Sequence, residues 1–242
     1  MEAGEWVRVT VYSAVFIALV FAATLIAVST PVTNGYFNLG ESMVYTAALL
    51  GGTLVGTIAG GIGSAMADLY LGYSHYAPGT LVIKGVEGFL AAWLYHKLSM
   101  LSRESLVRIS LPLSMLVGGF IAGAGAVLYG ALYGGSTQLE LWGRTYSFHI
   151  PFWAWALAGL VVGLIILYGV LRWDPSLSSA LIAMLVAGTW MVTGYFLYEA
   201  FVLGYGITAA SEIPVNFGQA VIGASIAYTI VSVARRAGYD QG

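Results

Sequence analysis

The stretch that decides the fold is residues 41–71, which read ESMVYTAALLGGTLVGTIAGGIGSAMADLYL. Its two charged residues, Glu41 and Asp68, lie near its ends. A helix needs about 20 apolar residues to cross the hydrocarbon core of a membrane. The stretch is therefore too long for one crossing and short for two full ones. We expect two shortened membrane helices, Glu41–Gly51 and Thr53–Leu71, with a break at the Gly51-Gly52 pair.

The whole chain has the composition of this stretch. Of its 242 residues, 59% are apolar and only 8% are charged, where soluble domains carry about 25% charged residues. The mean hydropathy is +0.86. Such a chain cannot cover a soluble globule with polar surface, and it lacks the high charge of a disordered one. The composition predicts an all-α integral membrane protein.

Charge and cysteine content exclude other classes. The net charge of −2 provides no basic field for nucleic acid. The absence of cysteine removes disulfides, thiolate metal sites and cysteine nucleophiles. The first apolar segment lacks a small-residue cleavage site, so we interpret it as a retained helix rather than a signal peptide.

Polar, proline and glycine residues divide the chain into eight expected membrane segments. The fifth and sixth are separated by a polar loop at residues 134–149. The eight segments are residues 6–28, 41–51, 53–71, 79–98, 108–133, 151–171, 177–203 and 213–233.

Basic residues predict the orientation, because loops on the cytoplasmic side carry an excess of Lys and Arg. With a cytoplasmic N-terminus, the outer loops hold only Arg144, and Lys84 lies inside a segment. We therefore expect a multi-pass protein of the cell membrane with both termini in the cytoplasm. The seven basic residues then on the inner side are Arg8, Lys97, Arg103, Arg108, Arg172, Arg235 and Arg236.

Polar residues within the segments gather on the outer half in this topology. Ionisable groups in a membrane are costly and need a partner, a cavity or a function. Their one-sided placement predicts a polar pocket open to the outside and a sealed inner half, because a water-filled channel needs polar lining along its length. These residues are Asn38, Glu41, Asp68, Lys84, Glu87, Glu199, Glu212, Asn216 and Gln219.

Structural roles remain open for the same residues. The spacings Asn38 to Glu41 and Asn216 to Gln219 fit capping boxes at helix starts. Lys84 and Glu87 lie three apart on one helical face and suit a structural ion pair as well as a binding site. The Asp68 and Glu199 carboxyls are also close enough to the outer ends of their segments to reach the membrane interface.

Aromatic residues cluster on the same outer side. Tyr36, His75, Tyr195 and Tyr198 stand at or near the outer ends of segments. An interfacial aromatic belt explains single residues of this kind. Aromatic walls with a few convergent polar groups also suit a flat heteroaromatic ligand.

Small residues recur every fourth position on two segments, a pattern that permits close helix approach in lipid. On the first segment, Ala14, Ala18 and Ala22 suit either a partner protein or packing within the chain. On the third, the residues at positions 52, 56, 60 and 64 favour packing within the chain.

Enzyme motifs are missing from the sequence. It contains no His-Glu-x-x-His, no phosphate-binding loop and no Gly-x-Ser-x-Gly. The three histidines, His75, His96 and His149, fall on both sides of the expected membrane and cannot form one metal site. We expect no catalytic residue, no metal and no cofactor, and no ATP hydrolysis by this chain alone.

Several short motifs together resemble a known family. They are GYFNLGE at 35–41, GGIGSAMADLYLGY at 60–73, HYAP at 75–78, IKGVEG at 83–88, GYFLYE at 194–199 and EIPVNFGQ at 212–219. The set resembles the substrate-binding S components of energy-coupling factor (ECF) vitamin transporters, in the riboflavin-type branch. The resemblance covers roughly residues 10–100 and 177–236.

The resemblance implies a six-helix membrane protein that binds a vitamin or precursor from outside. It would dock on a shared module of one transmembrane coupling protein and two ATPases, through the small-residue stripe Ala14, Ala18 and Ala22. The family pocket corresponds to Tyr36–Glu41, Lys84–Glu87, Tyr195–Glu199 and Glu212–Gln219. The expected ligand-binding residues are Tyr36, Asn38, Glu41, Asp68, His75, Lys84, Glu87, Tyr195, Tyr198, Glu199, Glu212, Asn216 and Gln219.

One departure from the family is expected. Two extra apolar segments at residues 108–172 would form a transmembrane hairpin inserted between residues 10–107 and 173–236, within a single membrane domain of 242 residues. The expected function is the substrate-binding subunit of an ECF-type ABC importer of a vitamin or related heteroaromatic molecule. The alternative is a stand-alone membrane carrier or scaffold that works without ATPases.

Overall fold

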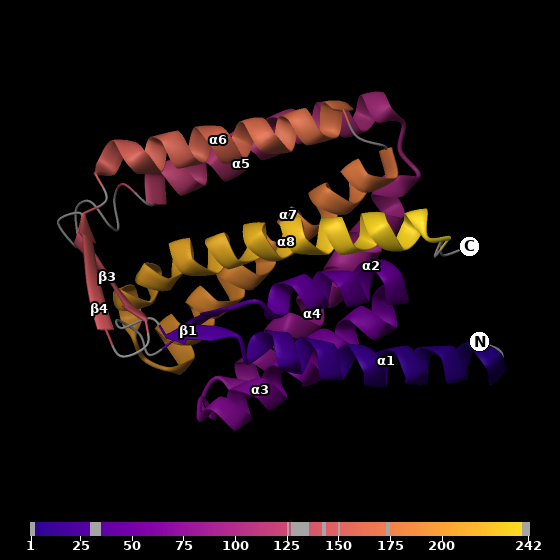
Figure 1. The fold of residues 1–242 in the computed structure, drawn as a ribbon, viewed down its shortest axis with the longest axis horizontal. Coiled ribbons are helices and arrows are strands. Elements are labelled where there is room, and N and C mark those ends of the chain that lie inside the picture. Colours follow the sequence, from indigo (N-terminus) through magenta and orange to yellow (C-terminus); the bar gives the residue numbers. More distant parts are fainter. Residues whose placement is uncertain are drawn as a thin grey trace.

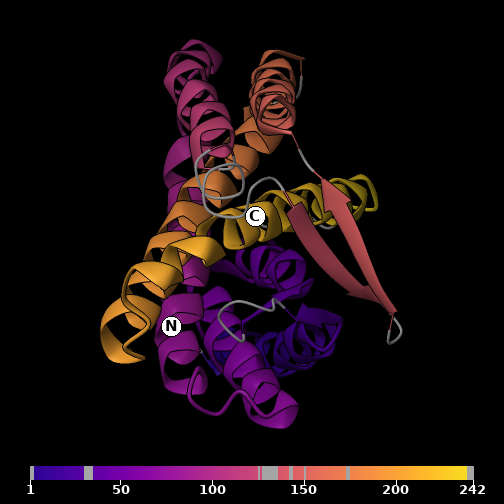
Figure 2. The ribbon, with the colours of Figure 1, turned by 90° about the vertical axis from the view of Figure 1, so that its left-hand side faces the viewer.

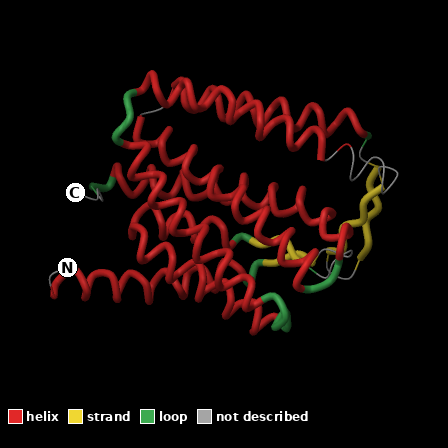
Figure 3. The backbone as a smooth tube through the Cα atoms, turned by 180° about the vertical axis from the view of Figure 1, so that it is seen from behind, coloured by secondary structure: helices red, strands yellow, loops and turns green. Residues whose placement is uncertain are grey.

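The computed structural model describes residues 3–29, 35–124, 126, 136–141, 144–149, 151–172 and 175–238. Long helices run back and forth along one axis (Figure 1). The N-terminal end of α1 and the C-terminal end of α8 lie at one end of this bundle, and both strand pairs lie toward the other (Figures 1 and 3).

The helices are joined in several places by short π-helical or 3-10 turns. The elements in chain order are α1 (Ala3–Thr24), β1 (Ala27–Ser29), β2 (Tyr36–Asn38), α2 (Gly40–Ile58), the π-turn η1 (Ala59–Gly63), α3 (Ser64–Leu71), α4 (Ala77–Ser99), α5 (Arg103–Ala124), β3 (Ser136–Leu141), β4 (Arg144–His149), α6 (Phe152–Arg172), α7 (Pro175–Leu197), the π-turn η3 (Tyr198–Val202), the 3-10 helix η4 (Gly206–Glu212) and α8 (Ile213–Arg236).

Six helical ranges of the described chain are long and apolar enough to cross a membrane, which fits an all-α membrane protein. Eight crossings are not confirmed. The range from α2 to α3 counts as one, and α4 is not among the six because Lys84 and Glu87 lower its hydropathy. The six ranges are Gly4–Thr24, Gly40–Leu71, Arg103–Gly123, Trp153–Arg172, Pro175–Val202 and Gly206–Arg236.

The expected break at the glycine pair is confirmed. Gly52 has φ 81° and ψ −172°, which no helix contains. A Cβ atom added to Gly56 would lie 2.9 Å from the Cα of Ala48, and one added to Gly60 would lie 3.1 Å from a Val44 methyl. In a straight helix these pairs would be about 12 and 24 Å apart. The chain therefore folds back at Gly52, and the first part of α2 packs against the part that follows.

Glycines also bring α4 close to this hairpin. A Cβ on Gly60 would lie 2.7 Å from the carbonyl oxygen of Lys84, and one on Gly56 would lie 2.8 Å from that of Gly88. The small-residue stripe at positions 56 and 60 thus packs within the chain, as expected. The close approach places the charged side of α4 next to α2, where the main core lies around Tyr45 and Met184.

Helices α5 and α6 form a hairpin of their own. They lie as a separate layer along one side of the other helices (Figures 1 and 2), and they pack chiefly against each other with smaller contacts to α7 and α8. A Cβ on Gly163 would lie 3.0 Å from the Ser114 carbonyl oxygen, so small residues permit this pairing too. The expected end of the fifth segment at residue 133 lies outside the described residues.

Two antiparallel strand pairs were not expected from the sequence. Strand β1 pairs with β2, with Ala27 opposite Asn38. Strand β3 pairs with β4, with Ser136 opposite His149, in the region expected to be a polar loop. The first pair matters for the site, because it fixes the segment Tyr36–Asn38 across the end of the helices.

Candidate ligand pocket

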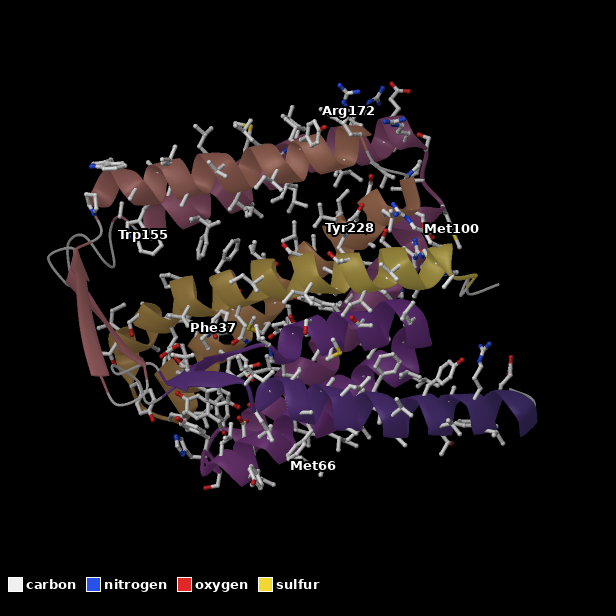
Figure 4. All side chains as sticks on the ribbon, in the orientation of Figure 1. Phe37, Met66, Met100, Trp155, Arg172 and Tyr228 are labelled. Carbon is white, nitrogen blue, oxygen red and sulfur yellow. The ribbon has the colours of Figure 1, made fainter. Side chains whose placement is uncertain are left out.

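A small pocket with a cavity volume of about 30 Å³ lies at the end of the bundle that carries β1 and β2. Phe37 marks this end in Figure 4, and Met100 and Arg172 mark the opposite end. Six elements contribute to the wall: β2, α3, α4, α7, η3 and the segment from η4 into α8. The lining residues are Gly35, Tyr36, Asn38, Asp68, Tyr76, Thr80, Tyr195, Glu199, Glu212, Asn216 and Gln219.

Most of the residues expected from the sequence meet at this pocket. Five do not line it: Glu41, Lys84 and Glu87 lie behind the wall, and His75 and Tyr198 lie beside it. The eight that do line it are Tyr36, Asn38, Asp68, Tyr195, Glu199, Glu212, Asn216 and Gln219.

Tyr36 and Asp68 form one part of the pocket wall. The Tyr36 hydroxyl donates a hydrogen bond to Oδ1 of Asp68, and its ring lies 4.7 Å from the Tyr73 ring. Burial, with the neighbouring Asp68 carboxylate, raises the pKa of Tyr36 far above its usual value. Tyr36 therefore stays a neutral donor that fixes the Asp68 side chain.

Two more carboxyl groups, those of Glu199 and Glu212, line the pocket. Glu199 lies on the π-turn η3, a wide turn of a kind often found at functional sites. Burial, with the charges of Glu199, Tyr205 and Glu212, raises the pKa of Tyr76, whose hydroxyl donates to Glu199. Oε2 of Glu199 is buried and has no hydrogen-bond partner among the described residues.

Glu212 faces the loop before β2. A Cβ atom at Gly35 would lie 2.9 Å from Oε1 of Glu212. A Cβ atom at position 35 would displace this carboxylate, so glycine leaves room for the position that Glu212 takes. Glu212 is only 3% exposed.

Tyr195 completes the wall from α7. Its hydroxyl donates to Oγ1 of Thr80 at 3.0 Å, and the Lys84 ammonium lies 5.6 Å from the centre of its ring. Tyr76 and Thr80 were missed as lining residues. A signal for both existed, because positions 76, 80, 84 and 87 follow helical spacing along one face.

Behind the pocket lies a buried charged network. The Lys84 ammonium is paired with Oε1 of Glu41 and with Oε2 of Glu87, the latter at 3.3 Å. Tyr45 donates to Glu87 at 2.8 Å. Gln219, which lines the pocket, donates to Glu41 at 3.0 Å and accepts the Asn38 backbone N–H at 2.8 Å. The network thus stands one hydrogen bond behind the pocket wall.

These contacts decide between capping and tertiary roles. The side-chain Oδ1 of Asn38 does accept a hydrogen bond from the backbone N–H of Gly40, at 2.8 Å. Glu41 does not complete a capping box, since it pairs with Lys84. Asn216 lies inside α8, which begins at Ile213, and Gln219 bonds across to Glu41 and Asn38. The capping-box interpretation is therefore wrong for both pairs.

The chain from residue 6 to residue 138 matches the family model described as "ECF-type riboflavin transporter, S component". The chain belongs to this family. An S component is a transporter subunit and not an enzyme. The match runs through α5 and ends before α6, so the motifs at residues 194–199 and 212–219 lie outside it.

Two curated relatives are similar to this S component over part of their length. One is an "uncharacterized protein in gap 3′ region" from Pyrococcus woesei, 45% identical over 31% of this chain and 51% of the relative. The other is the "thiamine precursor transporter HmpT" from Lactococcus lactis subsp. cremoris (strain MG1363), 33% identical over 41% of this chain and 52% of the relative. The chain spans about half the length of each. No solved structure matches it.

The two remaining site residues of the S component stabilise the rim. The Tyr198 hydroxyl donates to the backbone carbonyl of His75 at 2.8 Å, which joins η3 to the loop before α4. The His75 ring lies 4.8 Å from that of Tyr76. Both residues therefore support Tyr76 from outside the lining.

The alanine stripe of the S component faces outward. Ala14, Ala18 and Ala22 are all exposed on α1, whereas Ser13 and Val20 on the same helix are buried. The stripe does not pack within the chain, so that alternative is wrong. It leaves a smooth helical face that a second helix can approach closely.

Proposed function

We propose that this S component captures a vitamin-type small molecule from outside the cell and delivers it to an importer driven by partner ATPases. The observation that carries the proposal is the pocket itself, in which buried carboxyl, amide and tyrosine side chains meet at one end of the helices. A network of ion pairs and hydrogen bonds lies directly behind it, formed by Glu41, Lys84, Glu87 and Gln219.

The proposed orientation has both termini in the cytoplasm. The N-terminal end of α1 and the C-terminal end of α8 lie at the end of the bundle opposite β1 and β2 (Figure 1), and residues of β2 line the pocket. Seven of the nine Lys and Arg residues would then lie on the inner side, as the positive-inside rule requires. The pocket opens to the outside in this orientation.

The proposed ligand is a vitamin or precursor built on a flat heterocycle. The family is described by riboflavin, and HmpT is named for a thiamine precursor. Tyr36, Tyr76 and Tyr195 supply aromatic surface in the wall, which suits such rings. Riboflavin, a pyrimidine and a pyridoxine-type precursor all fit this description.

We also propose that all eight segments cross or enter the membrane, and that residues 108–172 are a hairpin inserted into a six-helix S-component core. The self-contained packing of α5 against α6 supports the insertion. The core would dock on the ECF coupling protein through Ala14, Ala18 and Ala22, whose exposure on α1 supports this role.

A stand-alone carrier is the second candidate, favoured by the separate α5–α6 layer (Figure 2), which offers additional membrane surface. Co-expression with an ECF coupling protein and its two ATPases separates the two functions. We expect the tagged chain to recover all three proteins. Uptake by the chain alone in liposomes, with no recovery of ATPase subunits, would establish the carrier instead.

A further inference from the structure

An apolar cavity of about 150 Å³ lies between the α5–α6 hairpin and α8. Phe120 and Ile121 line it from α5, and Trp155 and Val162 line it from α6. Trp155 is labelled in Figure 4 between the ribbons of α6 and α8. The hairpin packs chiefly against itself, with smaller contacts to α8, so the cavity remains at the seam between the two layers.

The side of α8 that lines this cavity faces away from the ligand pocket. Phe217, Gly218 and Val221 line the cavity, whereas Asn216 and Gln219 line the ligand pocket. At 3.6 residues per turn, these two sets lie on opposite sides of the helix. The cavity is therefore a second site, separated from the ligand pocket by α8 itself.

Gly218 leaves open space beside the cavity. Nothing in the described chain lies within 4 Å of a Cβ atom built at this position. By contrast, Cβ atoms at Gly56 and Gly88 would collide with the backbone of the neighbouring helix. Glycine inside a helix lowers stability relative to alanine, and no close packing among the described residues accounts for it at Gly218. The space is thus available to an occupant from outside the chain.

The chemistry and the size of the cavity decide what can occupy it. None of the described lining residues carries a charge, and an apolar cavity of about this size stays dry and binds hydrocarbons as small as benzene. Leaving the cavity empty would forfeit dispersion contacts along its walls. A helix from a partner protein, with a diameter of about 10–12 Å, is too wide to enter. A single hydrocarbon chain is narrow enough.

The membrane supplies such chains next to the cavity. Helices α5, α6 and α8 all belong to ranges that are long and apolar enough to cross a membrane. Ile222 lines the cavity and is also 44% exposed, so the cavity reaches the lipid-facing surface of the helices. Leu157 and Leu160 are exposed on the adjoining part of α6. A lipid chain can therefore enter from the side.

We propose that this cavity binds an acyl chain of a membrane phospholipid, which completes the packing between the α5–α6 hairpin and α8. The cavity lies in the halves of these helices nearest the strand pairs (Figure 1), so the chain belongs to the leaflet on that side. The bound chain supports α8 from the side opposite the ligand pocket. The site is distinct from the one proposed for the transported molecule.

The test is tryptophan fluorescence of the full-length protein in phosphatidylcholine bilayers with brominated acyl chains. Bromine quenches a tryptophan that it contacts, and the difference between each protein and its Trp155→Phe form isolates the emission of Trp155. We expect this emission to be quenched in the otherwise unchanged protein. Gly218→Leu fills the cavity with a side chain of the protein and should restore most of the lost emission.

Gly119→Leu is the matched control, because a Cβ atom at this position on α5 also meets nothing within 4 Å, and Gly119 does not line the cavity. It should leave the quenching of Trp155 unchanged. Two results would overturn the proposal. Unquenched Trp155 in the otherwise unchanged protein would show that no lipid chain enters, and equal quenching in Gly218→Leu would show that only lipid outside the cavity reaches Trp155.

Thermal unfolding in detergent provides a second measurement if a Trp155→Phe form does not fold. Added phosphatidylcholine should raise the unfolding midpoint of the unchanged protein and of Gly119→Leu by the same amount. It should raise that of Gly218→Leu by less, because the leucine already fills the site. An equal rise in all three proteins would contradict binding in this cavity.

Discussion

For Lys84, the buried ion pair with Glu87 was predicted correctly, but its place in the lining of the pocket was not. The sequence indicated a buried cation paired with Glu87, and the structure adds Glu41 as a second partner from α2. Since neither Lys84 nor Glu87 lines the pocket, their first role is to join α2 to α4.

Lys84→Ala should therefore act on stability before it acts on ligand binding. The change leaves two buried carboxyl groups without their cation, and breaking a buried pair in this way costs about 3–5 kcal/mol. The measurement is denaturant or thermal unfolding of the purified protein. Lys97→Ala, at an exposed position on the same helix, is the control and should change stability by less than about 0.5 kcal/mol. Equal stability of the two variants would show that the ion pairs contribute little.

The residues that line the pocket were predicted better from their chemical type than from their place in a local sequence pattern. Costly polar groups in apolar segments marked Asp68, Glu199, Glu212 and Gln219 without any knowledge of the fold. Thr80 has no charge, and a threonine in a helix commonly bonds to its own backbone, so only its helical spacing to Tyr76 and Lys84 pointed to it. Its role depends on Tyr195 reaching it from α7, a contact between residues 115 positions apart that no local pattern encodes.

At the scale of elements, the approach of α4 to the α2–α3 hairpin depends on glycine. A Cβ on Gly88 would collide with the backbone of Gly56. Gly88→Ala should separate the helices and destabilise the fold by about 1–3 kcal/mol. Gly119→Ala is the control, because nothing lies within 4 Å of a Cβ at that position on α5. Thermal unfolding measures both, and an unchanged midpoint for Gly88→Ala would refute the close-packing argument.

The alanine stripe on α1 gives a prediction about partners. A bulky side chain at its centre would hold a second helix away and remove the close contacts that drive association in lipid. Ala18→Trp should therefore abolish recovery of the coupling protein and ATPases and leave ligand affinity unchanged, because the pocket is lined by other elements.

Ile165→Trp places the same bulk on the exposed face of α6 and serves as the control. It should leave the complex intact. Full recovery of the complex by Ala18→Trp would rule out this face as the docking surface, and parallel loss of ligand binding would indicate misfolding instead.

Helices, strands and breaks were predictable where one strong sequence feature determined them. The break at the Gly51-Gly52 pair was foreseen because this pair interrupts a run too long for one crossing. The pairing of β1 with β2 was not, because three-residue strands are too short to show an alternating pattern. That pairing matters, since it holds Tyr36 and Asn38 over the ends of α3 and α8.

For the whole molecule, the topology is the prediction to check. The chain has no native cysteine, so single cysteines report on accessibility without background. Ser136→Cys at the start of β3 should react with an impermeant reagent from outside, and Ser102→Cys before α5 should react only from the cytoplasmic side. Reaction of Ser136→Cys from the cytoplasm alone would reverse the orientation and place the pocket inside.

The number of crossings is harder to predict from the sequence than the bias in basic residues between the two sides. Charge bias depends on loops, and the loops were clear in the sequence. Hydropathy depends on the lipid-facing surface, and α4 carries its Lys84–Glu87 pair into the core, where it lowers the average without facing lipid. Only the lipid-facing side of such a helix is apolar. Hydropathy averaged over consecutive residues does not separate that side from the side that faces the core.

The central claim is that this S component holds a small heteroaromatic molecule in the pocket between β2, α3, α4, η3 and α8. Native mass spectrometry of the protein purified from cells tests it most directly. The account predicts a bound small molecule on the wild-type chain, retained by Ala18→Trp and lost from Glu199→Gln. Equal occupancy of the wild-type and Glu199→Gln proteins, or adducts of lipid alone on the wild type, would contradict it.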